Sequence, residues 1–135
     1  MSKQIFVNLP VSNLKNAMDF YTQLGFTNNP QFTDDTAACM VWSDAIFVML
    51  LTKEKFKSFT NKEVADTKKA ISVMNSLSLE SADAVKDFVA KALAAGGTEP
   101  SEAKDYGFMI QHTIEDPDGN HWEPFFMDMS KFPQQ

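Results

Sequence analysis

Apolar and polar positions follow two kinds of pattern along the chain, and the order of these patterns occurs twice. Apolar residues recur at helical spacing in residues 14–24 and 84–93, and glycines follow both segments. Short runs rich in β-branched and aromatic residues, separated by turn residues, predict strands. These runs lie at residues 5–11, 31–33, 37–42, 45–52, 71–79, 98–101, 107–115 and 120–127. Each half therefore contains a strand, a helix and three further strands.

The repeat predicts the fold class. A unit that occurs twice in one small chain indicates an α+β fold made of two βαβββ modules related by pseudo-twofold symmetry. We expect a single domain over residues 1–135, with the first module at 1–55 and the second at 70–135. Two curved sheets of this kind would enclose a cleft, which is a natural site for a small molecule.

The connecting segment at residues 56–69 differs in composition from both modules. Residues 53–69 hold six of the twelve lysines, and Phe56 and Phe59 lie among them. We expect a partly helical segment whose two phenylalanines anchor it or form a lid. A solvated linker is the alternative.

Composition and charge exclude several kinds of partner. The 135 residues include 12 lysines, no arginine and 18 acidic residues, which gives a net charge of −6. Specific reading of DNA relies on bidentate arginine contacts, and phosphate backbones and anionic lipids attract a positive field. We therefore expect no nucleic-acid partner and no membrane partner. The 12 phenylalanines and 8 methionines indicate a phenylalanine-rich core. A more specific interpretation is that some of them also line an apolar ligand cavity.

The expected location follows from features that the sequence lacks. Cys39 is the single cysteine, so we expect neither a disulfide framework nor a cysteine cluster for zinc. The first ten residues contain no long apolar segment of the signal-peptide type. The longest apolar run, Ala45–Leu51, is far too short to span a membrane. A cytoplasmic location is the resulting expectation.

Two motifs add to the repeat. The first is Leu9-Pro-Val-Ser-Asn-Leu14, followed by Phe20-Tyr21 and Leu24-Gly25-Phe26. The second is Asp116-Pro-Asp-Gly-Asn-His-Trp-Glu123. Together with the repeat, they resemble the vicinal oxygen chelate superfamily, the group of glyoxalase I, fosfomycin and bleomycin resistance proteins and extradiol dioxygenases. The resemblance covers essentially the whole chain and implies the glyoxalase/bleomycin resistance/dioxygenase-like fold.

The resemblance also implies where a metal would bind. Members with chemistry hold one divalent ion through two ligands from each module, and the ion stabilises an enolate or oxyanion. The matching positions in this sequence are Phe6, Leu50, Met74 and Glu123. A one-residue slip would replace Leu50 by Met49 or Leu51, and only Glu123 is a ligand of the required kind. We therefore expect an apolar patch in place of the metal, and no other cofactor.

Strand alternation selects the other residues that face the expected cleft. The predicted ligand-binding cleft is lined by Phe6, Asn8, Leu50, Met74, Ser76, Ser78, Gln111, Thr113 and Glu123. This mixture of side chains suits a small, partly apolar molecule that a few hydrogen bonds orient.

Glu123 has two interpretations at this point. It is a general base or ligand anchor in an apolar cleft, or a relic carboxylate hydrogen-bonded to neighbours such as His121 or Asn8. His121 lies two residues away on the same face, so the two side chains are candidates for a proton relay. The catalytic residues otherwise stay unknown. His112 is expected to pack between sheet and helix, and Asp116 to form the turn before the last strand.

Three functional hypotheses remain open. The first is a metal-free protein of the glyoxalase and bleomycin-resistance type that binds a small molecule. The second is a metal-dependent lyase or isomerase of the glyoxalase I type, against which the missing ligands and arginines count, or another enzyme of the superfamily that uses Glu123. A metal-independent enzyme that uses Glu123 and His121 also stays open. The third is a homodimer whose clefts have decayed. The resemblance implies a homodimer in any case, and a dimer surface is one interpretation of the apolar residues near the C-terminus, namely Phe125, Phe126, Met127, Met129 and Phe132.

Overall fold

The computed structural model describes residues 3–132 of the chain. The chain forms two compact units, Met1–Ala70 and Ile71–Gln135, each with its own sheet. The longest helix within the described residues has 13 residues, and no helix there is long and apolar enough to cross a membrane.

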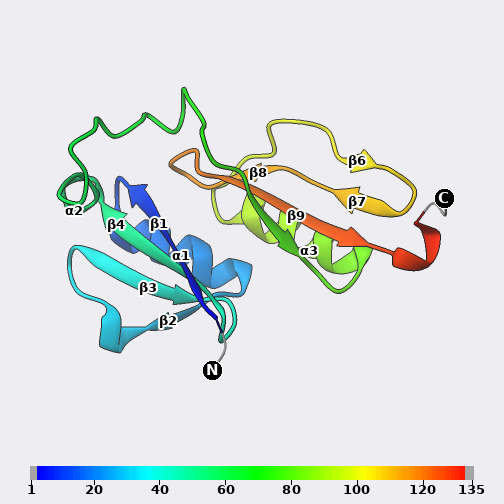
Figure 1. Ribbon diagram of the computed structural model, residues 1–135, viewed down its shortest axis with the longest axis horizontal. Coiled ribbons are helices and arrows are strands. Elements are labelled where there is room, and N and C mark those ends of the chain that lie inside the picture. The colour runs from blue at the N-terminus through cyan, green and yellow to red at the C-terminus, as the bar shows by residue number, and fades with distance from the viewer. Residues whose placement is uncertain (1–2, 133–135) are drawn as a thin grey trace. The chain divides into compact units, whose positions relative to one another are not determined.

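The first unit is a four-stranded sheet with a helix on one face (Figure 1). Its elements are β1 (Ile5–Val11), α1 (Leu14–Leu24), β2 (Thr27–Asn29), the 3-10 helix η1 (Pro30–Phe32), β3 (Ala37–Val41), β4 (Ile46–Thr52) and the short helix α2 (Lys53–Lys57). The strands lie in the order β1-β4-β3-β2. β1 runs parallel to β4, and the other neighbours are antiparallel.

Local sequence signals set both ends of α1. The Asn13 side chain accepts a hydrogen bond from the backbone N–H of Asn16 at 3.0 Å, which caps the N-terminus. Gly25 ends the helix at a φ of 114°, a conformation that strains any residue with a Cβ. The apolar stripe of α1 is buried on the sheet, as are Val48 and Leu50 of β4, both 0% exposed. The predicted helix and the glycine that ends it are therefore confirmed.

The strand expected at residues 31–33 is wrong. Residues 30–32 form η1 instead, and the strand lies earlier, at Thr27–Asn29. Pro30 occupies the first helical position, where its missing N–H costs nothing, and the Asn29 side chain accepts a hydrogen bond from Gln31 N–H at 3.1 Å. This Asn-Pro pair starts a helical turn rather than a strand.

The short helix α2 lies at the start of the lysine-rich stretch at 53–69, and only its last two residues belong to the connecting segment. α2 is capped by Thr52, whose hydroxyl accepts a hydrogen bond from Lys55 N–H at 3.2 Å. Phe56 is half-buried, whereas Phe59 is 69% exposed. Of the two phenylalanines, Phe56 is therefore the one that packs.

The second unit repeats this order of a strand, a helix and three strands, except that the second strand after the helix is divided in two. It contains β5 (Asn75–Ser78), α3 (Ala82–Ala94), β6 (Lys104–Asp105), β7 (Met109–Gln111), β8 (Ile114–Glu115), β9 (His121–Met127) and the 3-10 helix η2 (Met129–Lys131). The strands lie in the order β5-β9-β7-β6, and β8 also pairs with β9. β5 is parallel to β9, as β1 is to β4. The α+β class with two βαβββ modules is confirmed by these two topologies.

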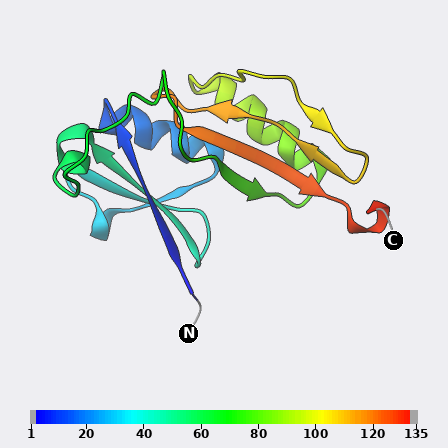
Figure 2. The ribbon, with the colours of Figure 1, turned by 45° about the horizontal axis from the view of Figure 1, so that its top comes forward.

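α3 covers one face of the second sheet and packs mainly on β9 (Figure 2). The Ser81 side chain caps it by accepting a hydrogen bond from Ala84 N–H at 3.0 Å. Its apolar stripe includes Val85 and Phe88, and the sheet contributes Trp122 to the same core. All three side chains are less than 4% exposed.

Prolines shorten two of the predicted strands in this unit. At residues 98–101 only Thr98 pairs, with Glu115, because Pro100 cannot donate to a ladder. The strand expected at 107–115 is divided into β7 and β8. His112 N–H donates to the Pro124 carbonyl at 3.0 Å, but Pro124 has no N–H to donate in return, so the ladder is interrupted there.

The predicted strand at 71–79 is also too long. β5 pairs with β9 from Asn75 opposite Trp122 onwards, and β9 itself begins at His121. Residues 71–73 therefore have no strand beside them, and Met74 lies just before β5 rather than within a strand.

The turn before β9 is held by a buried carboxylate. Asp116 is 3% exposed and accepts hydrogen bonds from the backbone N–H groups of Asp118 (2.9 Å) and Asn120 (2.8 Å). The Asn120 side-chain amide adds a third at 2.9 Å. Gly119, at a φ of 87°, completes the turn. The predicted turn is confirmed, and it fixes where β9 begins.

Candidate functional site

The register of β1 against β4 determines which side chains share the open face of the first sheet, the face opposite α1. Phe6 pairs with Phe47, and Asn8 pairs with Met49. Paired residues project from the same face of a sheet. Leu50 follows Met49 by one residue, so it projects toward α1 and is 0% exposed. The prediction that Leu50 lines the cleft with Phe6 and Asn8 is therefore wrong, and Met49 takes its place.

The reason for this error lies in the composition of β4. Its residues are apolar at every position from Ile46 to Leu51, so alternation of polar and apolar side chains gives no signal of which face each one occupies. The open face of this sheet is itself apolar. The Phe6 and Phe47 rings stack with centroids 4.4 Å apart and an interplanar angle of 9°, and Phe6 is 50% exposed.

Glu123 lies on the open face of the second sheet, the face opposite α3, and bonds to two neighbours. Its Oε1 accepts a hydrogen bond from the Ser76 hydroxyl at 2.9 Å. Its Oε2 lies 3.0 Å from Nε2 of His121. The side chains of His121 and Glu123 are 14% and 16% exposed. Because residues 76 and 123 pair in register and 121 is two positions away on the same strand, the sheet itself brings the three groups together.

The remaining predicted residues of this unit share that face. Ser78 pairs with Phe125, and Gln111 pairs with Phe125 from the other side. β7 and β8 keep one register against β9, which places Thr113, between them, opposite Glu123. Met74 lies outside β5 and is 60% exposed.

The contacts of Glu123 limit what it can do. An ionised carboxylate only accepts hydrogen bonds, and here each oxygen already has a donor from the same sheet. His121 is one of the two partners named for the relic interpretation, and Ser76 is a partner that the sequence did not indicate. The group is a polar cluster, which we call the Ser76–Glu123–His121 cluster.

The residues at the family's ligand positions do not fit a divalent metal. Phe6 and Leu50 have no lone pair to offer a metal ion. Met49, the neighbouring alternative, offers only a thioether, which is too soft for ions held by His and Glu. Met74 has the same shortcoming. Within residues 3–132, no three or more His, Cys, Asp or Glu side chains are grouped so that they could hold a metal ion.

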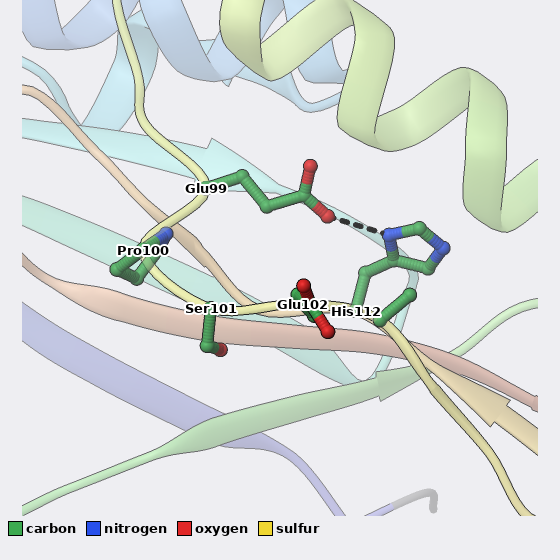
Figure 3. A pocket seen from close by; sticks show the side chains of 6 residues that line it. Glu99, Pro100, Ser101, Glu102 and His112 are labelled. Carbon is green, nitrogen blue, oxygen red and sulfur yellow. Dashed lines mark hydrogen bonds and ion pairs between the residues drawn. The ribbon is translucent and has the colours of Figure 1, made fainter.

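A second carboxylate–histidine pair lies on the helix-covered side of the second sheet. Nδ1 of His112 is 2.7 Å from Oε2 of Glu99, and Figure 3 shows the two side chains directed at one another. They border an open hollow of about 460 Å³ together with residues 100–103. The sequence predicted only that His112 packs near the helix. The sequence gave no signal for Glu99. Residues 98–101 were predicted to be a strand, but Glu99 lies in a loop there, and its pairing with His112 depends on that loop.

Comparisons with known proteins agree with this topology. The family model of the Glyoxalase/Bleomycin resistance protein/Dioxygenase superfamily matches residues 3–123. A hypothetical protein, SA1046 from S. aureus, has 25% identity and a TM-score of 0.78, with 93% of this chain and 95% of that chain covered. A glyoxalase/bleomycin resistance protein/dioxygenase family enzyme from Burkholderia phytofirmans PsJN has 17% identity and a TM-score of 0.76, with coverage of 93% and 99%.

A glyoxalase-related enzyme from Fulvimarina pelagi has 16% identity and a TM-score of 0.78, with 93% of this chain and 88% of that chain covered. No curated protein sequence matches the chain. The family model spans most of the chain, and the two βαβββ topologies are those that the sequence motifs led us to expect. The chain belongs to the Glyoxalase/Bleomycin resistance protein/Dioxygenase superfamily.

Proposed function

We propose that this protein binds a small, partly apolar molecule on the open faces of its two sheets and that it does so without a metal ion. The observation that carries the proposal is the state of Glu123. This residue stands at the family's last ligand position, yet both of its oxygens are engaged by Ser76 and His121. An ion there would have no three His, Cys, Asp or Glu side chains of residues 3–132 grouped to hold it.

The character of the two open faces supports a partly apolar ligand. The first sheet contributes the stacked rings of Phe6 and Phe47 beside the side chain of Asn8. The second contributes hydroxyl and carboxylate groups beside the half-buried ring of Phe125. Ligand sites typically combine a large apolar lining with a few polar groups that fix orientation.

The test is a ligand-detected NMR screen of a library of small aromatic and aliphatic compounds, followed by affinity measurements on two variants. Phe6→Ala removes an aromatic ring from the open face, and we expect it to weaken the binding of hits about tenfold or more. Phe59→Ala is the matched control, because Phe59 is also exposed but lies in the connecting segment. Its affinity should stay within about twofold of the wild type. The proposal fails if no compound binds, or if the two variants weaken binding equally.

The same proposal includes a homodimer. Apolar side chains at the end of the described chain support it, because Met127, Met129 and Phe132 are 37%, 61% and 43% exposed. Sedimentation equilibrium should show a dimer that Met129→Lys weakens, and a monomer at all concentrations would contradict this part. The cytoplasmic location stays a prediction from the sequence.

A further inference from the structure

The Ser76–Glu123–His121 cluster fixes the orientation of an imidazole on the open face of the second sheet. Glu123 accepts from Ser76 at one oxygen and meets Nε2 of His121 at the other. Because a carboxylate has no proton to give, the hydrogen in the second contact belongs to Nε2. In a neutral ring this contact favours the Nε2–H tautomer, which leaves a lone pair on Nδ1.

That lone pair is available to a ligand. Among residues 3–132, the side chain of His121 makes no hydrogen bond other than the one to Glu123, so Nδ1 has no partner there. Nδ1 is also not sealed from solvent, because the described residues contain no fully buried side-chain nitrogen or oxygen that lacks a hydrogen bond. An oriented acceptor that solvent reaches is a group on which a ligand can act.

The other histidine shows the opposite arrangement. In His112 it is Nδ1 that meets a carboxylate, Oε2 of Glu99, at 2.7 Å. The two histidines therefore favour different tautomers, and they lie on opposite sides of the same sheet. This difference supplies an internal control for the state of His121.

We propose that Nδ1 of His121 is the hydrogen-bond acceptor that selects ligands with an O–H or N–H donor on an apolar body, such as a phenol or an enol. This inference rests on the proposed function and names the ligand class of that same site. Phe125, four positions beyond His121 on the same face of β9, supplies a half-buried apolar ring on the face that carries the acceptor. Glu123 and Ser76 are positioning residues, since they act through His121.

The first test is the tautomeric state of the free protein. Long-range ¹H–¹⁵N NMR distinguishes the two ring nitrogens, and spectra are recorded at about pH 8, where a free imidazole in water is neutral. His121 should show a protonated Nε2 and an unprotonated Nδ1, and His112 the reverse. Glu123→Gln should convert His121 alone to a mixture of tautomers. A protonated Nδ1 in wild-type His121 overturns the inference, whatever the ligand.

The second test compares two probes of nearly equal shape, phenol and anisole, of which only phenol donates a hydrogen bond. We expect phenol to bind about fivefold more tightly, because one neutral hydrogen bond distinguishes the probes. His121→Phe should abolish the preference, and His112→Phe, the matched control, should retain it. Equal affinity of the two probes overturns the inference and leaves the proposed function standing. If neither probe binds, the inference is overturned and the proposed function fails for aromatic ligands.

Discussion

Removal of the Glu123 carboxylate tests the geometry of the candidate site through stability. Glu123→Ala deletes the acceptor of two hydrogen bonds and leaves Ser76 and His121 without it. Hydrogen bonds to charged groups contribute about 1.5–3 kcal/mol each, although partial exposure lowers that figure. With Ser76 exposed and Glu123 16% exposed, we expect the free energy of unfolding to fall by about 1–3 kcal/mol.

A double-mutant cycle separates the contribution of the Glu123–His121 contact from the other effects of removing the Glu123 carboxylate. We expect the effects of Glu123→Ala and His121→Ala to be non-additive by about 1–2 kcal/mol, because the two groups touch at 3.0 Å and are mostly buried. The assay is urea unfolding followed by far-UV circular dichroism. The control cycle combines Glu123→Ala with His112→Ala, which lies on the other side of the sheet, and its coupling should not exceed about 0.5 kcal/mol. If the coupling energy of the first cycle is no larger than that of the control cycle, the contact between Glu123 and His121 is refuted.

Three further predictions follow from burial and from shifted pKa values. Leu50→Ala should lower the free energy of unfolding by about 2.7–5 kcal/mol, and Met49→Ala by clearly less, because Leu50 is 0% exposed and Met49 faces outward. Equal losses of stability in urea unfolding would contradict the faces assigned to the two residues. Burial raises the pKa of the Cys39 thiol above its usual value of about 9, so the folded chain keeps a proton that the unfolded chain loses. As the pH rises above about 9, stability should therefore fall more steeply in the wild type than in Cys39→Ala, and identical slopes would argue against a buried thiol. Backbone and side-chain hydrogen bonds from Thr36 lower the pKa of Asp34 below about 3.8, so its contribution to stability is present above that pH and is lost as the pH falls through the folded value. An NMR titration of Asp34 that gives a normal or raised pKa would contradict those contacts.

The sequence predicted well wherever one residue type determines the local backbone. Gly25 ends α1 because a positive φ is a property of a single residue. At the helix starts the sequence offers two capping candidates each, Ser12 or Asn13 and Ser81 or Asp83, and the structure uses Asn13 and Ser81. The turn at Asp116 follows the same logic. The repeated βαβββ order, and through it the fold, could be derived from these signals.

Sequence reasoning failed where the outcome depends on a neighbouring strand. The face of Leu50 depends on register within a strand that is apolar throughout, and the break between β7 and β8 depends on Pro124 across the ladder. For the site, alternation correctly placed His121 beside Glu123. Ser76 as a partner, and the pairing of Glu99 with His112, arise from contacts between segments far apart in the sequence.

The central claim is that Glu123 serves the chain's own cluster rather than a metal ion. The most direct test is elemental analysis of protein purified without chelators, followed by calorimetric titration with zinc, nickel, manganese and cobalt. The account predicts no stoichiometric metal and no tight binding of any of these ions, in the wild type and in Glu123→Gln alike. One ion per chain that is lost on Glu123→Gln would contradict the account and would favour a metal-dependent lyase or isomerase.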